Sequence, residues 1–294
     1  MSLSIVYITS REEPMLRWFF DSLARQVKHP QRVVVVDFFG RKWGDSRLDV
    51  VSVPPMPNVW NGPHRLTKED WFNPAAFRNT GICHCPNDFI AFVDDVSVLM
   101  PGWIECVAEA EAKQYVVCGA YRKVKNILVE DGLVKGYQES SNDNRLAYRH
   151  GGAESCGGQW LYGCSCAGPI SAFLKVGGWP EGLSCGCGFE DIPMGLLLQN
   201  SGADIRYDPR MMTFESEEHH QNLKVFIRRD KGVSPADKSH AILHKAQVSK
   251  HLDNPSIPQG IAALREHILA GGEFPVPTEP QHDWYDNQLI SEMA

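Results

Sequence analysis

Apolar runs and amphipathic stretches alternate along the first part of this chain. The apolar runs predict strands at residues 3–8, 32–37, 50–53, 89–93 and 115–118. Apolar positions that recur at helical spacing predict connecting helices at residues 15–26, 73–83 and 102–111. This alternation predicts an α/β fold, with a doubly wound and mostly parallel sheet flanked by helices.

The pattern changes after Lys123. Two short strands are predicted at residues 126–130 and 133–137, and the polar stretch 139–158 is typical of a binding loop or lid. A helix is predicted at residues 190–199, closed by Gly202.

The chain beyond His220 differs in style. It predicts helices at residues 237–251 and 259–270, followed by a proline-rich tail. We therefore expect one domain over residues 1–220 and a helical C-terminal extension over residues 221–294.

Composition narrows the class of protein. The chain has 294 residues, of which 43% are hydrophobic and 22% charged, as in ordinary soluble domains. Its net charge of −7 gives no global attraction to nucleic acid. No apolar run is long enough to span a membrane, and the start lacks the pattern of a secretion signal, so we expect a cytoplasmic protein.

Three C-x-C pairs contain six of the nine cysteines: Cys83/Cys85, Cys164/Cys166 and Cys185/Cys187. A structural metal is the sharper interpretation, but the spacing is not the usual C-x-x-C. Reduced, partly buried thiols are the favoured interpretation.

Asp94 and Asp95 follow directly after the predicted strand at residues 89–93. In open α/β sheets, ligands bind in the crevice beyond the carboxyl ends of the strands. Two adjacent acids are costly there unless a cation compensates them, and a divalent ion carrying a diphosphate would do so. The alternative is an acidic strand-to-turn corner without a ligand.

Glu190 and Asp191 form a second acidic pair, in the first turn of the helix at residues 190–199. Acids favour helix N-termini, so this position alone is weak support for a site. Glycines before the pair would let the backbone approach a ligand closely.

The order of these segments resembles the inverting family 2 glycosyltransferases of the GT-A fold. The resemblance covers roughly residues 3–220 and depends on these segments in order: the first strand with TSREEP, the strand ending VVD, FNPAAFRNTGI, the strand with VDD, and GGWPEG followed by GFEDIPMGLLL. It implies a nucleotide-sugar half at about residues 1–120 and an acceptor half at about residues 121–220.

The resemblance also implies roles for residues. Thr9, Arg11 and Asp37 would line the pocket for the nucleobase and ribose, and Arg78 would approach the diphosphate, with Asn79 bracing its helix. Asp94 and Asp95 would hold ribose and a divalent ion. Asp191 would be the general base that takes the proton of the acceptor hydroxyl, and Glu190 would orient acceptor or base.

The acidic D-x-D motif of the family ends here in Val96, so its usual second metal carboxylate is absent. His219 and His220 lie where related enzymes often place a metal-binding histidine, although either can also belong to a solvated helix start. The resemblance implies Mn²⁺ or Mg²⁺ as cofactor and a UDP-sugar as donor, and weak metal dependence is the alternative. Trp160 and Trp179 could stack on acceptor sugar rings.

Two other functions remain open. A nucleotidyltransferase or pyrophosphorylase usually has a glycine-rich basic loop after the first strand, which TSREEP lacks. A non-catalytic nucleotide- or glycan-binding relative fits Val96, but the Glu190–Asp191 pair argues against it.

The acceptor is left open between a glycan, a lipid-linked glycan, a protein and a hydroxymethylated DNA base of phage type. The basic residues that could contact DNA phosphate are Arg228, Arg229, Lys231, Lys238, His244 and Lys245. A solvated helical face is favoured over DNA binding for these residues.

Overall fold

The computed structural model describes residues 2–58, 73–148, 151–181, 190–220, 247–254 and 256–276. Its centre is one sheet with the main strand order β3-β2-β1-β4-β9-β6-β10-β5. The strands are β1 (Leu3–Thr9), β2 (Arg32–Asp37), β3 (Val50–Val53), β4 (Phe89–Asp94), β5 (Ser97–Leu99), β6 (Val116–Glu130), β7 (Leu133–Asn142), β8 (Glu154–Ser155), β9 (Ser165–Pro169) and β10 (Ile205–Ser216). The helices are α1 (Leu16–Ala24), α2 (Pro74–His84), α3 (Trp103–Lys113), α4 (Ile170–Lys175), α5 (Asp191–Asn200), α6 (Glu217–His220) and α8 (Ile261–Leu269).

The sheet is mixed rather than mostly parallel. Strands β3, β2, β1 and β4 are parallel, as predicted. Strand β9 then runs antiparallel to both β4 and β6, while β10 is parallel to β6 and antiparallel to β5. The small residues of β9 have no apolar alternation, which is why the sequence pattern did not predict this strand.

Alternating side chains of the central strands form two cores. Leu3, Ile5 and Tyr7 of β1 pack on one face with α1 and α3. Val6 and Ile8 point to the opposite face, which is covered by α2, α4, α5 and α8. Because successive side chains of a strand point to opposite faces, a strand buried on both faces is mostly apolar.

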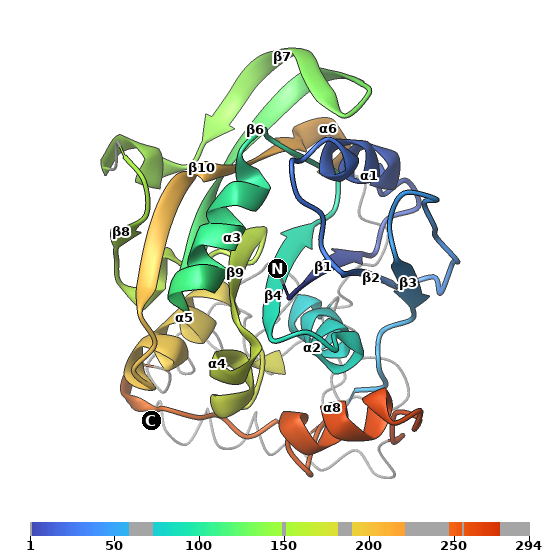
Figure 1. Ribbon diagram of the computed structural model, residues 1–294, viewed down its shortest axis with the longest axis vertical. Helices are drawn as coiled ribbons and strands as arrows, with labels where there is room; N and C mark the ends of the chain where they lie inside the picture. The colour runs from blue at the N-terminus through green and yellow to red at the C-terminus, as the bar shows by residue number, and fades with distance from the viewer. Residues whose placement is uncertain are drawn as a thin grey trace, which may run out of the picture.

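Three residues of the sequence determine where helix α2 begins and how closely it packs on the sheet. Asn73 caps its N-terminus by accepting a hydrogen bond from the Ala76 amide at 3.0 Å, and Pro74 occupies the first helical position. Gly81 lets the helix lie on β1, because a Cβ there would come within 2.3 Å of Val6. Helix α8 packs against α2, at the lower end of Figure 1.

A long hairpin of β6 and β7 extends from the sheet, at the top of Figure 1. The two short strands predicted at 126–130 and 133–137 are the ends of these longer strands, so their predicted extent was wrong. The predicted loop 139–158 instead contains the end of β7, a 3₁₀ turn at Asn144–Tyr148 and β8. The sequence pattern did not predict the full length of β6, because the exposed end of this strand contains polar residues and therefore lacks a continuous apolar run.

The helix predicted at 237–251 lies mostly outside the described residues, and the domain division near residue 220 stays a prediction. Within the described residues, no helix combines the length and the apolar character that crossing a membrane requires.

Candidate functional site

Three predicted site residues lie together at the carboxyl ends of adjacent parallel strands. Thr9 ends β1 opposite Asp37 of β2, and Ile8 of β1 lies opposite Asp94 of β4. The strand order therefore places residues that are far apart in the sequence at one edge of the sheet, where ligands bind in this class of fold.

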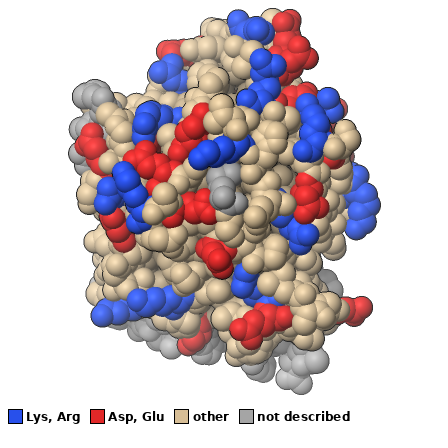
Figure 2. Space-filling model, viewed as in Figure 1, with Lys and Arg blue, Asp and Glu red and all other residues tan. Residues whose placement is uncertain are grey.

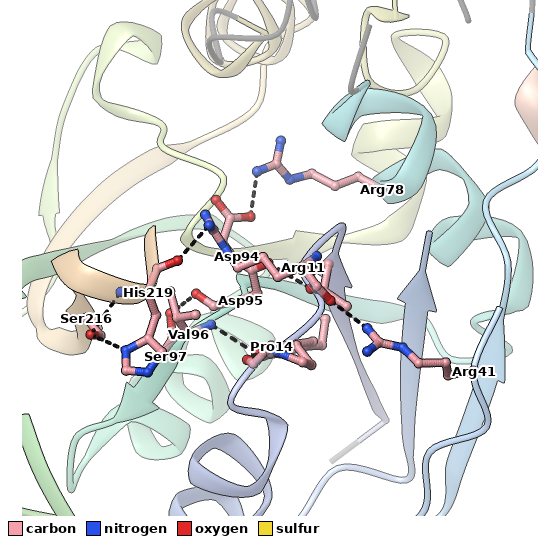
Figure 3. Close-up of polar contacts among 12 residues, drawn as sticks. Arg11, Pro14, Arg41, Arg78, Asp94, Asp95, Val96, Ser97, Ser216 and His219 are labelled. Atoms are coloured by element: carbon pink, nitrogen blue, oxygen red, sulfur yellow. Dashed lines mark hydrogen bonds and ion pairs between the residues drawn. The ribbon is translucent and has the colours of Figure 1, made fainter. Parts of the chain in front are cut away.

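Arg78 of α2 joins the two acidic pairs. Its Nη2 donates to Asp94 Oδ1 at 2.8 Å, and its Nη1 donates to Glu190 Oε1 and to Asp191 Oδ1, the latter at 3.4 Å. Figure 3 shows the Arg78 guanidinium directed at Asp94. The end of β4 and the start of α5 thus face one common site.

The Arg78 guanidinium is almost fully buried, with 1% of the residue exposed. Burial lowers the pKa of Arg78, but the charges of Asp94, Asp191 and Glu190 outweigh this effect and raise it. The guanidinium lies over the Trp179 ring at 4.6 Å. Gly163 lets the chain pass close by, since a Cβ there would lie 2.3 Å from Arg78 Cζ.

The prediction that Trp179 stacks on an acceptor is wrong. Its ring is fully buried and contacts Arg78, Phe92 and Phe173. Asn79 holds the same segment, since its amide donates to the Trp179 carbonyl at 2.9 Å and its oxygen accepts from the Trp179 amide at 2.7 Å. Trp179 therefore packs against the Arg78 guanidinium and supports its position.

Asp191 is a carboxyl group with altered acidity. Burial, followed by the charge of Glu190, raises its pKa well above the ordinary range, against the opposing effect of Arg78. Its side chain remains 23% exposed, whereas that of Glu190 is buried. Asp191 is therefore the member of the pair that solvent and a ligand can reach.

Asp95 is held by two neighbours from the loop after β1. Its Oδ1 accepts from Arg11 Nε at 2.7 Å, and its Oδ2 accepts from Thr9 Oγ1 at 2.7 Å. Burial raises the pKa of Asp95, and Arg11 and Thr9 oppose that shift. Both carboxylate oxygens of the expected metal ligand thus already have protein partners.

Val96 occupies the third position of the acidic motif and has an unusual backbone. Its φ of 55° lies in the left-handed region, which β-branched residues rarely adopt. Its amide donates to the Pro14 carbonyl and to the Tyr7 hydroxyl, both at 3.1 Å, and its carbonyl accepts from the Ser216 amide. These bonds fix the strained turn that carries Asp94 and Asp95.

The expected histidine ligand does not join these acids. His219 Nδ1 is 2.7 Å from Ser216 Oγ, and the ring packs edge-on against Trp18. Figure 3 shows the imidazole turned towards Ser216 rather than towards Asp94. The side chain of His220 lies outside the described part of the structure.

Two of the residues expected to hold a divalent cation, Asp95 and His219, therefore do not fit one in the described structure. Asp95 is paired through both oxygens, the Val96 side chain offers no oxygen ligand, and the His219 ring is engaged elsewhere. Among the described residues, no group of three or more His, Cys, Asp or Glu side chains could hold a metal ion.

Asp37 is buried and bonded through both oxygens. It accepts from the Phe39 amide, from Arg41 Nε and Nη2 and from Trp43 Nε1, at 2.6–3.1 Å. Arg41 also donates to the carbonyls of Arg11 and Glu12, both at 2.6 Å. Arg41, which the sequence analysis did not single out, thus ties the loop after β2 to the loop after β1.

Glu215 of β10 was also missed. It lies beside Ser97 in the sheet, and one of its oxygens has no hydrogen-bond partner among the described residues. Burial raises the pKa of Glu215 to about 7, Lys123 lowers it, and Asp94 adds to the rise. Its position in a strand directly before Glu217 and Glu218 could have pointed to Glu215, but the sequence pattern did not predict β10.

Trp160 is half-buried and packs against Tyr207 at 5.1 Å. The basic residues considered for DNA binding lie outside the described residues. On the face drawn in Figure 2, the acidic and basic side chains of the described residues are interspersed.

Comparison with curated proteins gives distant relatives. A pre-mycofactocin glycosyltransferase from Mycobacterium tuberculosis (strain CDC 1551 / Oshkosh) is 27% identical over 199 residues, which cover 67% of this chain. The protein of the same name from strain ATCC 25618 / H37Rv gives the same figures. The chain spans 40% of the length of these relatives, and no family model matches it.

Comparison with solved structures identifies the fold. S. aureus TarS 1–349 in complex with UDP superposes with a TM-score of 0.55 at 14% identity, covering 92% of this chain and 70% of TarS. The complex of TarS with UDP-GlcNAc also gives 0.55, at 13% identity, covering 92% and 71%. GalNAc-T7 with UDP, GalNAc and Mn²⁺ gives 0.53 at 11% identity, covering 100% and 57%. The predicted GT-A-like α/β fold is thereby confirmed.

Proposed function

We propose that the protein is an inverting glycosyltransferase that moves a sugar from a UDP-sugar to an acceptor hydroxyl. The observation that carries the proposal is the Arg78 bridge, which joins Asp94 at the strand end to Asp191 at the helix start. Glycosyl transfer requires the sugar donor and the acceptor hydroxyl to meet in one site, with Asp94 on the side of the donor and Asp191 on the side of the acceptor. The solved structures of similar fold contain UDP or UDP-GlcNAc, and the curated relatives are named glycosyltransferases.

The chemistry assigns one proton transfer to this chain. The acceptor oxygen bonds to the anomeric carbon as the bond from that carbon to the diphosphate oxygen breaks. The hydroxyl proton passes to Asp191, and the bonding electron pair leaves with the diphosphate. A carboxylate with a raised pKa is a stronger base than an ordinary aspartate, which favours this role for Asp191.

The other site residues act as positioning groups. Arg78 contacts both Asp191 and Glu190, and the Trp179 ring supports Arg78 from the other side. Glu190 orients the acceptor or the base. Thr9 and Arg11 line the donor pocket and orient Asp95. The four donors around Asp37 give its carboxylate a role in ordering the loops of that pocket. Trp160 remains the candidate platform for the acceptor.

Mn²⁺ or Mg²⁺ was expected, and GalNAc-T7 contains Mn²⁺. Because the described donor set does not assemble around a cation, no step of this mechanism passes through a metal. Nucleotidyl transfer, the other enzymatic function considered, is not favoured, since Arg78 is directed at carboxylates and the loop after β1 lacks the glycine-rich basic sequence.

Turnover of nucleotide sugars tests the proposal. The protein is incubated with a panel of UDP-sugars, with and without candidate acceptors, and released UDP is measured. We expect one UDP-sugar to be consumed, slowly with water and faster with the acceptor. The same UDP-sugar should raise the melting temperature by mass action. A folded protein that neither binds nor consumes any UDP-sugar would refute the function.

A further inference from the structure

Arg11 connects the two segments that were expected to supply metal ligands. Its Nε donates to Asp95 Oδ1 at 2.7 Å, and its Nη1 donates to the His219 carbonyl at 2.8 Å. Figure 3 shows this guanidinium between the end of β4 and α6. A cation thus already lies between the acidic strand end and the histidine segment, and it belongs to the chain itself.

The surroundings of Arg11 favour this arrangement over a bound metal. Arg11 is buried, with 3% of the residue exposed, and Thr9 satisfies the second oxygen of Asp95. A metal ion that bound Asp95 would have to break this buried ion pair, which leaves a buried guanidinium without its carboxylate. The Val96 side chain provides no replacement ligand in the buried turn.

Arginine is suited to this task. Its guanidinium stays charged at every physiological pH, and its N–H groups match carboxylate and phosphate oxygens. Without Arg11, Asp95 would present an uncompensated negative charge to an approaching diphosphate. With Arg11, the buried guanidinium compensates that charge at the carboxyl ends of β1 and β4.

We propose that the Arg11 guanidinium, held by Asp95 and the His219 carbonyl, replaces the divalent cation in this site, so that the nucleoside diphosphate binds without metal. The proposal rests on the proposed function, because it concerns the diphosphate of the donor. It concerns binding and charge compensation only, and leaves the proton transfer to Asp191 unchanged.

Titration calorimetry with UDP tests the proposal on the full chain. UDP is titrated in excess EDTA and again in saturating Mn²⁺, and Mn²⁺ binding to the protein is followed separately by electron paramagnetic resonance. We expect the UDP affinity to differ by less than about twofold between the two conditions. We also expect no binding of Mn²⁺ to the protein without nucleotide, so that the Mn²⁺ spectrum is the same as that of the free ion.

Variants locate the effect at Arg11. Arg11→Gln should weaken UDP binding about tenfold or more in EDTA. Arg11→Lys should recover part of that loss, because lysine keeps the positive charge but lacks the planar set of N–H donors of the guanidinium. Arg17→Gln is the matched control, since the Arg17 side chain is 72% exposed and pairs with Asp21 on the surface of α1. It should bind UDP as the wild type does.

The outcomes separate this proposal from the proposed function. UDP binding that requires Mn²⁺, or that Arg11→Gln leaves unchanged, overturns the guanidinium proposal and leaves glycosyl transfer intact. Absence of UDP binding by the folded protein in both conditions overturns both proposals. If Arg11→Gln does not fold, the wild-type titrations and the Mn²⁺ spectra still decide the question.

Discussion

Arg78 Nη2 lies 2.8 Å from Asp94 Oδ1, and this ion pair joins the end of β4 to α2 at the edge of the sheet. The same guanidinium contacts Glu190 and Asp191, which are more than a hundred residues further along the chain. One buried cation therefore organises three carboxylates at the centre of the site.

Substitution of Arg78 should be strongly destabilising. Arg78→Met leaves Asp94, Glu190 and Asp191 facing one another without a cation, and removal of one partner of a buried ion pair costs about 3–5 kcal/mol. Urea denaturation measures the free energy of unfolding. Arg17→Met, on the exposed face of α1, is the control and should change it by less than about 1 kcal/mol. A similar small loss for Arg78→Met would refute the organising role of Arg78.

Gly163 offers a milder perturbation of the same group. A Cβ at Gly163 would lie 2.3 Å from Arg78 Cζ, so Gly163→Ala should displace the guanidinium and lower both turnover and melting temperature. Gly44→Ala is the matched control, because no atom lies within 4 Å of a Cβ built there. Equal effects of the two substitutions would show that Arg78 tolerates displacement.

The raised pKa of Asp191 predicts how stability depends on pH. The folded chain holds this proton more tightly than the unfolded chain, whose aspartate has the ordinary value of 3.8. Between that pH and the raised pKa the folded state binds more protons, so Asp191 makes stability fall as pH rises. Asp191→Asn removes this contribution and should be more stable than the wild type at alkaline pH, with the difference shrinking towards pH 4.

Melting temperatures measured across this pH range check the prediction. Asp253→Asn is the control, because the Asp253 side chain is 97% exposed. Parallel pH profiles for the wild type and Asp191→Asn would mean that the pKa of Asp191 is not raised.

Asp191→Asn should also abolish transfer without loss of donor binding. An amide cannot accept the acceptor proton, and loss of a general base lowers the rate by about 10²–10⁴-fold. UDP release measures the rate, and calorimetry with UDP measures donor affinity. Turnover near the wild-type level would remove Asp191 from the role of base.

The sequence predicted the elements whose patterns are strong. Strands β1, β2 and β4 each contain a run of mostly apolar residues rich in β-branched or aromatic side chains, and α2 has the Asn73–Pro74 start typical of helices. Strand β10 was missed because Pro209 and charged residues interrupt it, and its pairing with β6 shifts register between Tyr207 and Met212. Strand β5 has only three residues, too few for a periodic signal.

The candidate site was predictable in part. Asp94 follows a clear strand, so its place at the sheet edge came from local pattern. The contact between Arg78 and Glu190 joins distant segments, and only the resemblance to a family suggested that these residues share a site. The Arg11–Asp95 pair and the saturation of Asp37 by Arg41 depend on loop conformations that local sequence does not specify.

A crystal structure with an intact UDP-sugar, or a non-hydrolysable analogue, tests the central claim most directly. The quantity to measure is the distance from the anomeric carbon to the Asp191 carboxylate, together with the face of the sugar that the carboxylate approaches. The account predicts the diphosphate at the ends of β1 and β4, with room for one acceptor hydroxyl between the sugar and Asp191. A donor bound elsewhere, or one whose anomeric carbon faces away from Asp191, would contradict it.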